Sequence, residues 1–155
     1  MKFSNPMIVV SNMEKSKKFY YEVLRLEVVV DFGANVTLTG GIALQTKDTW
    51  LSFICKQNDE IAFGGNVAEL YFEEDDFDRF IQKINSISDI NYVHPMIEHS
   101  WGQRVIRFYD PDKHIIEVGE NIVTVVKRFL NSGLSIEETA IRMDVPVDYI
   151  ESCLK

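Results

Sequence analysis

The sequence predicts an α+β protein built from two βαβββ modules and followed by a small helical segment. Short β-prone runs bounded by Gly and Asn alternate with helical stretches over residues 1–120. The order of one strand, one helix and three strands occurs twice in that range. The last 35 residues carry helical patterns instead, so they are expected to form a separate extension.

The first module is expected over the first sixty residues. The run "PMIVV" predicts a short strand, and the following "SNMEKSKKFYYEVL" predicts a helix that Ser11 or Asn12 can cap. The apolar positions that recur at helical spacing in this stretch are Phe19, Tyr20, Val23 and Leu24. Three β-prone runs, "EVVVDFG", "NVTLTG" and "GIALQTK", complete the module.

The second module repeats this order. The run "AELYFE" predicts a strand, and "DDFDRFIQKINSI" predicts a helix whose acidic start opposes the positive end of the helix dipole. One face of that helix is apolar and consists of Phe77, Phe80, Ile81 and Ile84. The runs "NYVHPMIE", "GQRVIRFY" and "HIIEV" predict the last three strands.

The extension, residues 121–155, predicts three short helices. The first has an apolar face made of Ile122, Val125, Val126, Phe129 and Leu130 and ends at Gly133. Ser135 and Glu138 form a capping box for the second helix, and the third follows Pro146.

The end of the extension, "LSIEETAIRMDVPVDYIESCLK", resembles a helix-turn-helix of small regulators, yet it is not basic. Asp148 and Glu151 lie in the would-be recognition helix, where phosphates would repel them. DNA is therefore an unfavoured partner. We expect the helices to cover apolar surface or to act as a cap or dimerisation element.

Composition narrows the function classes. A chain of 155 residues with 46% hydrophobic residues can bury a core, and its net charge of -8 disfavours nucleic acid and anionic membranes. No apolar run approaches the ~20 residues that span a bilayer, and "MKFSNPMIVV" lacks a signal-peptide core, so a cytoplasmic protein is expected. Cys55 and Cys153 are expected to be ordinary thiols.

Polar residues interrupt the strands at related places in the two modules. Glu117 lies in the middle of the apolar run "HIIEV", where an ionised carboxylate is costly unless something pairs with it. Gln45 has the same place in "GIALQ". Asn5 and Glu69 each lie seven residues before a predicted helix cap, Asn12 and Asp76. These four polar side chains, Asn5, Gln45, Glu69 and Glu117, are expected to occupy equivalent positions and to converge on one pocket.

Two segments, "VVSNMEKSKKFYYEVLRLEVV" and "WGQRVIRFYDPDKHIIEVGE", resemble the vicinal oxygen chelate superfamily of glyoxalases, fosfomycin-modifying enzymes, extradiol dioxygenases and bleomycin-binding resistance proteins. The resemblance covers about residues 1–120. It implies an open, curved mixed sheet and a homodimer. It also implies metal ligands on the first and last strand of each module, which here would be Asn5, Gln45, Glu69 and Glu117.

The ligand set departs from the family because none of the four residues is a histidine. The resemblance implies a divalent metal such as Mn²⁺, Mg²⁺, Ni²⁺ or Zn²⁺, or none. Amide oxygens are poor ligands for Zn²⁺ or Ni²⁺, so an all-oxygen set would suit Mn²⁺, Mg²⁺ or Ca²⁺ better.

Two function classes follow. The first is a glyoxalase-like lyase in which Glu69 and Glu117, as catalytic residues, hold a metal that polarises a substrate carbonyl. The second is a metal-free protein that binds a small molecule for resistance or sensing, with Glu69 and Glu117 paired to Arg, amides or water. Whether the protein is an enzyme stays open at this point.

Substrate-binding candidates lie in "EHSWGQRVIRFYDPDKH". A four-residue turn at Asp110 to Lys113 would place Arg104 on the face of Glu117, whereas a shift of one residue would turn Arg107 inward instead. Trp101 is expected to form a pocket wall, and His99 to lie beside it in a loop. The substrate-binding prediction therefore names Trp101, Arg104 and His99.

Overall fold

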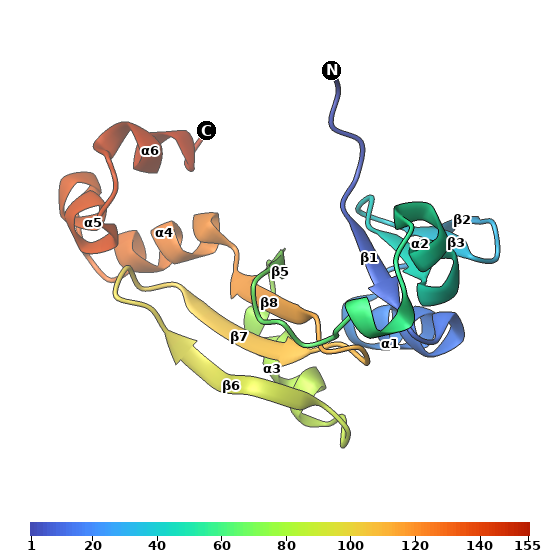
Figure 1. Ribbon diagram of the computed structural model, residues 1–155. Helices are drawn as coiled ribbons and strands as arrows, with labels where there is room; N and C mark the ends of the chain where they lie inside the picture. The colour runs from blue at the N-terminus through green and yellow to red at the C-terminus, as the bar shows by residue number, and fades with distance from the viewer. The chain divides into compact units, whose positions relative to one another are not determined.

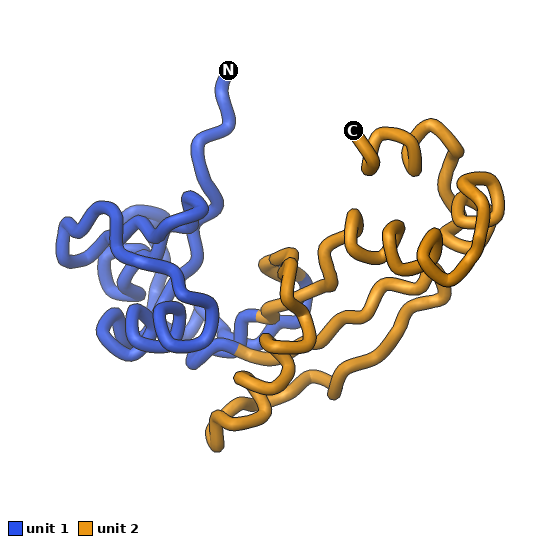
Figure 2. The backbone as a smooth tube through the Cα atoms, turned by 180° about the vertical axis from the view of Figure 1, so that it is seen from behind, with its two compact units in different colours: residues 1–67, 110–114 blue, residues 68–109, 115–155 orange.

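The structure, a computed structural model, describes all residues 1–155 (Figure 1). The chain consists of two compact units, shown in different colours in Figure 2. Unit 1 consists of Met1–Val67 and the turn Asp110–His114, and unit 2 of Ala68–Tyr109 and Ile115–Lys155. None of the helices is both long and apolar enough to cross a membrane.

Unit 1 contains the first βαβββ module. Its elements are β1 (Met7–Val10), α1 (Met13–Leu24), β2 (Val28–Asp31), β3 (Asn35–Leu38), β4 (Ala43–Thr46), α2 (Lys47–Ile54) and a 3-10 turn (Asn58–Glu60). The strand order is β1-β4-β3-β2, in which β1 and β4 are parallel and the other pairs antiparallel. Asn12 is the cap of α1, since its side chain accepts a hydrogen bond from Lys15 N at 2.9 Å.

The helix α2 is not predicted from the sequence. None of its residues is buried, and its apolar residues, Trp50, Leu51, Phe53 and Ile54, lie in a run of only eight residues, which is too short to reveal a helical period. It ends at Cys55, which has the left-handed conformation with φ 54°.

The turn Asp110–His114 packs within unit 1 through its acidic side chains. The buried hydroxyl of Tyr20 donates to Asp110 Oδ2 at 2.9 Å, and Ser11 N donates to Asp112 Oδ2 at 3.0 Å. His114 Nδ1 lies 2.8 Å from Asp110 Oδ2. The sequence did not indicate this cluster, in which His114 has a carboxylate partner.

Unit 2 contains the second module, namely β5 (Glu69–Glu74), α3 (Phe77–Asn85), β6 (Asn91–Glu98), β7 (Arg104–Tyr109) and β8 (Ile115–Glu120). The strand order β5-β8-β7-β6, with β5 and β8 parallel, repeats that of unit 1. Asp76 caps α3, whose buried side chains include Phe77, Phe80 and Ile84. The predicted α+β fold of two βαβββ modules with open mixed sheets is therefore confirmed.

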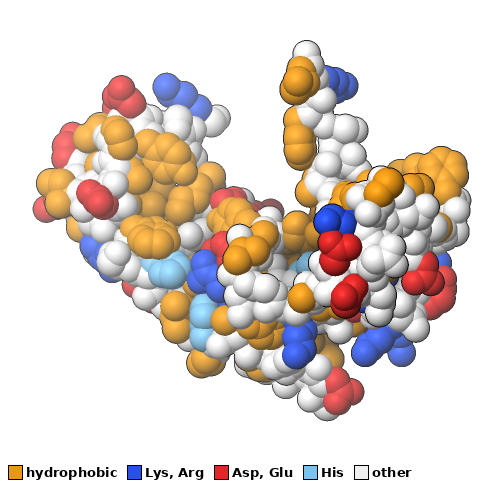
Figure 3. Space-filling view, in the orientation of Figure 1, with side chains coloured by type: hydrophobic (Ala, Val, Ile, Leu, Met, Phe, Trp, Pro, Cys, Tyr) orange, Lys and Arg blue, Asp and Glu red, His pale blue; other side chains and the backbone are white.

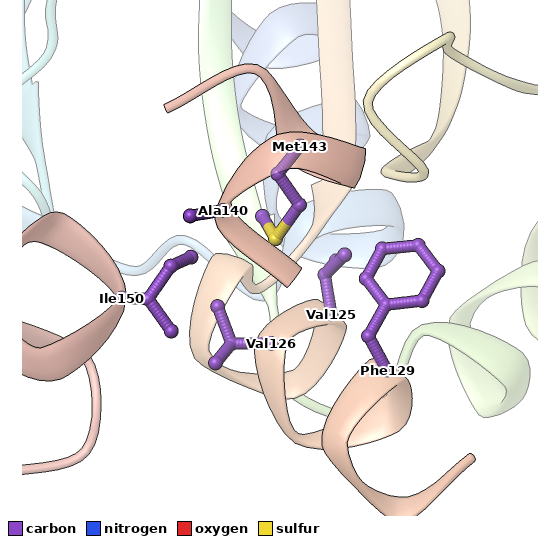
Figure 4. Packing of buried hydrophobic residues seen from close by; sticks show 6 residues of the cluster. All are labelled: Val125, Val126, Phe129, Ala140, Met143 and Ile150. Carbon is purple, nitrogen blue, oxygen red and sulfur yellow. The ribbon is translucent and has the colours of Figure 1, made fainter. Parts of the chain in front are cut away.

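The three helices of the extension, α4 (Ile122–Asn131), α5 (Ile136–Met143) and α6 (Val147–Ser152), lie in unit 2. They share a buried core, drawn in Figure 4, of Val125, Val126, Phe129, Ala140, Met143 and Ile150. The predicted capping box of Ser135 and Glu138 starts α5. These short helices are thus stabilised mainly by packing against one another, as helices of this length require.

Two arginines join the extension to the loop between β6 and β7. Arg128 donates to Gly102 O at 2.6 Å, and Arg142 donates to Ser100 O. The Phe129 ring packs directly against Gly102. The extension therefore supports the loop that carries Trp101.

Candidate functional site

One face of the second sheet collects polar side chains. Strand alternation and the observed registers, Tyr71 opposite Glu117 and Glu117 opposite Arg107, place Glu69, Tyr71, Arg107 and Glu117 on the same face. We call this the site face. The other face packs on α3, where the rings of Phe80 and Phe108 lie 6.5 Å apart.

Arg107 connects the carboxylates of the site face. Its Nε donates to Glu69 Oε2 at 2.9 Å, and its Nη2 forms an ion pair with Glu117 Oε2. The Glu117 side chain is 8% exposed, against 38% for Glu69. An ionised carboxylate as buried as Glu117 requires a partner, and Arg107 is that partner.

His94 takes a third donor of Arg107. His94 Nε2 lies 3.3 Å from Arg107 Nη1, and His94 Nδ1 lies 2.7 Å from Pro95 O. A carbonyl oxygen can only accept, so the ring hydrogen belongs on Nδ1 and leaves Nε2 free to accept from Arg107. No spacing in the sequence indicated this contact between His94 and Arg107.

Arg104 does not share the face of Glu117. The turn spans five residues, Asp110 to His114, with Lys113 in the left-handed conformation at φ 66°. Tyr109 consequently pairs with Ile115 rather than with His114. The additional turn residue selects the alternative register, in which Arg107 faces Glu117.

Arg104 binds carboxylates on the opposite face. Its Nε and Nη2 donate to the two oxygens of Glu120 at 3.1 and 3.0 Å, and its Nη1 donates to Asp78 at 2.7 Å. Arg128 is a second donor to Glu120, with its Nη2 3.1 Å from Glu120 Oε2. Burial alone would raise the pKa of Glu120, yet the hydrogen bonds from both arginines outweigh it and lower that pKa.

The loop between β6 and β7 brings His99 and Trp101 together. Their rings stack with centroids 4.2 Å apart. The pKa of His99 is lowered by burial and by the nearby positive charge of Arg107 and by His94. His99 is therefore mostly neutral near pH 7, which suits a stacking partner better than a charged group.

Gln103 links this loop to the site face. Its Oε1 accepts from Trp101 Nε1 at 3.2 Å, and its Nε2 donates to Tyr71 Oη at 2.9 Å and to Glu120 O at 2.8 Å. Gly119 leaves space for the side chains of Gln103 and Tyr71, because a Cβ there would lie 2.9 Å from Gln103 Nε2 and 3.2 Å from the Tyr71 ring. Tyr71 in turn donates to Glu73 Oε1 at 3.0 Å.

In unit 1, the side-chain amide of Gln45 is already hydrogen-bonded to other protein groups. Asn35 Nδ2 donates to Gln45 Oε1 at 2.8 Å, and Gln45 Nε2 donates to Ala34 O at 3.0 Å and to Thr49 Oγ1. The side-chain oxygen is the only atom of Gln45 that binds metals, and it accepts a hydrogen bond here.

Asn5 is not at the position equivalent to Glu69. It precedes β1, which begins at Met7. Met7 pairs with Ala43, two residues before Gln45, just as Glu69 pairs with Ile115, two residues before Glu117. The equivalent residue is therefore Met7. The equal spacing of seven residues does not indicate equivalence, because β5 has six residues and β1 only four.

The residues present do not fit the metal that the family resemblance implies. In unit 2, the guanidinium of Arg107 already pairs with both Glu69 and Glu117, and a metal ion there would have to displace it. In unit 1, Gln45 Oε1 already accepts a hydrogen bond from Asn35, and Met7, whose thioether is a soft ligand, stands at the other position. As arranged, no three His, Cys, Asp or Glu side chains are grouped to hold a metal ion.

Sequence reasoning missed Tyr71, Gln103 and Glu120. Tyr71 could have been found, because it lies two residues after Glu69 in one strand and so shares its face. Gln103 and Glu120 act through contacts between a loop and a strand end, which no local spacing reveals.

A family model described as a glyoxalase-like domain matches residues 3–123. A protein of unknown function from Agrobacterium tumefaciens str. C58 is similar at 39% identity, with a TM-score of 0.71 over 78% of this chain and 94% of that chain. No curated protein matches the sequence.

More distant solved structures show the same fold. A glyoxalase-related enzyme from Fulvimarina pelagi is 16% identical with a TM-score of 0.62 over 76% of this chain and 88% of its own. A glyoxalase/bleomycin resistance protein/dioxygenase from Nocardioides is 15% identical with a TM-score of 0.60 over 77% of this chain and 83% of its own. Together with the matched domain and the paired βαβββ modules, these similarities show that the chain belongs to the glyoxalase-like family of the vicinal oxygen chelate superfamily.

Proposed function

We propose that this protein binds a small organic molecule on the site face without a metal ion. The observation that carries the proposal is the position of Arg107, whose guanidinium is held by Glu69, Glu117 and His94. A fixed organic cation thus stands between the two carboxylates that a catalytic metal would need.

The charges of the site face favour a particular kind of ligand. Arg107 contributes one positive charge and directs its donors to protein groups, while Glu69 and Glu117 contribute two negative charges. The face therefore offers no free guanidinium to a substrate carboxylate or phosphate. Arg104, predicted to bind the substrate, likewise has its donors on Glu120 and Asp78. A neutral or cationic ligand fits this face better than an anion.

Aromatic surface next to the charged cluster supports a binding role. Tyr71 is 48% exposed and Trp101 is 37% exposed, which are large exposures for side chains fixed by hydrogen bonds. Rings of this kind lose little conformational entropy when a flat ligand packs on them. Sequestration or sensing of a compound would need no more than such a surface.

Calorimetric titration with Mn²⁺, Ni²⁺ and Zn²⁺ tests the proposal. We expect the chelator-stripped wild-type protein to give no stoichiometric binding. Arg107→Ala should bind at least one of these metals about tenfold or more tightly, because two carboxylates lose their counter-ion. Arg107→Gln keeps most of the side-chain volume and should gain metal affinity in the same way as Arg107→Ala. Arg79→Ala removes an exposed arginine of α3 and should behave as wild type.

The opposite outcome would support the lyase class. Stoichiometric metal in the wild-type protein, lost in both Glu69→Ala and Glu117→Ala, would mean that Arg107 gives way to the metal. Activity assays with glyoxalase-type substrates would then follow.

We also expect a homodimer, as the family resemblance implies. The apolar side chains of the edge strand β2 are exposed, by 44% at Val28 and 61% at Val29, and an interface would cover such a strand. A molar mass of about 36 kDa by light scattering, twice the 17.9 kDa of the chain, would agree with this expectation, whereas the single-chain mass would contradict it.

A further inference from the structure

A pocket of about 580 Å³ lies between the Trp101 loop and the helices of the extension, all within unit 2. Its principal lining residues are Trp101, Ile122, Met143, Asp144, Val145 and Tyr149. Four of these six lie beyond residue 123, where the match to the glyoxalase-like domain ends. The pocket is therefore a feature that the extension adds to the family fold. In Figure 3, hydrophobic side chains gather over the C-terminal helices.

Two aromatic side chains present their rings to this pocket. Trp101 is 37% exposed and Tyr149 is 42% exposed. Trp101 is held in place, since His99 stacks on it and Gln103 accepts its indole N–H. A rigid indole and a phenol ring on one pocket provide electron-rich surfaces for a ligand.

The charged groups at this pocket are acidic. Asp144 is the ionisable carboxylate of the lining, and Glu73 is close enough to Tyr149 to contribute, after burial and Cys153, to raising the pKa of that phenol. The nearby basic side chain, Arg142, donates to the backbone oxygen of Ser100, which also lines the pocket, and pairs with Glu98. Its guanidinium lies 5.1 Å from the centre of the Phe129 ring. The pocket thus combines aromatic walls with a carboxylate, and the guanidinium beside it is paired with Glu98.

We propose that this pocket binds an organic cation, a protonated amine or a quaternary ammonium group attached to an apolar body. A cation gains from the faces of Trp101 and Tyr149 and from the charge of Asp144, while Ile122, Met143 and Val145 cover the apolar part. The site shares Trp101 with the aromatic surface described above but does not involve Arg107. It therefore goes beyond the proposed function and stands whether or not a metal binds at Glu69 and Glu117.

Benzyltrimethylammonium is a suitable probe, and phenylacetate and benzyl alcohol are its anionic and neutral counterparts. The chain has two tryptophans, so Trp50→Phe leaves Trp101 as the only reporter of fluorescence. We expect the ammonium probe to quench Trp101 with a Kd on the order of 1 mM, as befits a fragment, and the two counterparts to bind at least about fivefold more weakly.

Matched variants locate the site. Tyr149→Ala and Asp144→Asn should each weaken binding by about threefold to tenfold, and Tyr149→Phe should restore it, because the ring is kept. Asparagine tolerates the left-handed conformation of residue 144, φ 57°, so Asp144→Asn changes charge without straining the backbone. Tyr21→Ala and Asp148→Asn remove an exposed phenol and an exposed carboxylate outside the pocket and should leave the Kd unchanged.

Three outcomes would overturn the proposal. These are absence of quenching at about 10 mM probe, equal affinity for the charged and uncharged probes, and an unchanged Kd in both pocket variants. A metal found at Glu69 and Glu117 would overturn the proposed function and leave this result intact. Circular dichroism of each variant separates lost binding from lost folding.

Discussion

Gly102 determines how the Trp101 loop meets the extension, and Gly102→Ala should be strongly destabilising. Gly102 has φ 87°, a backbone region that alanine adopts only with strain. An added Cβ would also overlap the Phe129 ring, at 2.6 Å from Cε2, which is far inside normal contact. Phe129 is 8% exposed and belongs to the core of the extension, so the ring has little room to move.

A matched control separates the two causes of this destabilisation, backbone strain and overpacking. Gly133 has φ 100° and open space around its Cβ position, so Gly133→Ala reports the left-handed strain alone, at about 1 kcal/mol. Gly102→Ala adds overpacking of a buried ring, which typically costs about 1–3 kcal/mol. We therefore expect the free energy of unfolding to fall by about 2–4 kcal/mol in Gly102→Ala.

Urea unfolding followed by Trp101 fluorescence in the Trp50→Phe background measures these differences, since Trp101 reports on unit 2. Equal losses for Gly102→Ala and Gly133→Ala would refute the reasoning. They would mean that Phe129 does not press on the loop and that the extension does not fix the position of Trp101.

Two further predictions concern buried charge. Burial alone would lower the pKa of His114, yet its hydrogen bond to Asp110 and the charge of that carboxylate outweigh burial and raise that pKa. His114 should therefore stabilise unit 1 below pH 6.5, its ordinary pKa, and this contribution should be lost as the pH rises through the folded-state pKa. Urea unfolding at several pH values tests this, because the stability of His114→Gln should lack this pH dependence. Glu120→Ala should lower the stability of unit 2, because it leaves two arginines without their buried partner. The loss should be about 3 kcal/mol, the lower end of the usual range, because these arginines are partly exposed to water. Because the pKa of Glu120 is lowered, its contribution to stability should be lost as the pH falls through that pKa. Glu151→Ala is the control, and a loss of stability as large as that in Glu120→Ala would contradict this prediction.

Much of the fold could be predicted because local signals agreed with one another. The caps Asn12 and Asp76, the capping box of Ser135 and Glu138, and the apolar face of α4 all appear in the structure as expected. Alternating apolar runs likewise located each strand to within a few residues. The helix α2 was not predicted because a run of eight residues is too short to distinguish a helical period from other patterns.

The candidate site was less predictable because it depends on register. One additional residue in the turn, with Lys113 in the left-handed conformation, decides whether Arg104 or Arg107 faces Glu117. A difference of two residues in strand length places Met7, not Asn5, at the equivalent of Glu69. Offsets of this size lie within the uncertainty of strand ends read from sequence, yet they change which side chains meet.

The most direct test of the account is the metal content of the wild-type protein after chelator treatment and reconstitution with Mn²⁺, Ni²⁺ or Zn²⁺. With Arg107 between Glu69 and Glu117, we predict well below about 0.1 metal ion per chain after removal of free metal. A ratio of about one that disappears in Glu69→Ala and in Glu117→Ala would contradict the account and identify the two carboxylates as metal ligands.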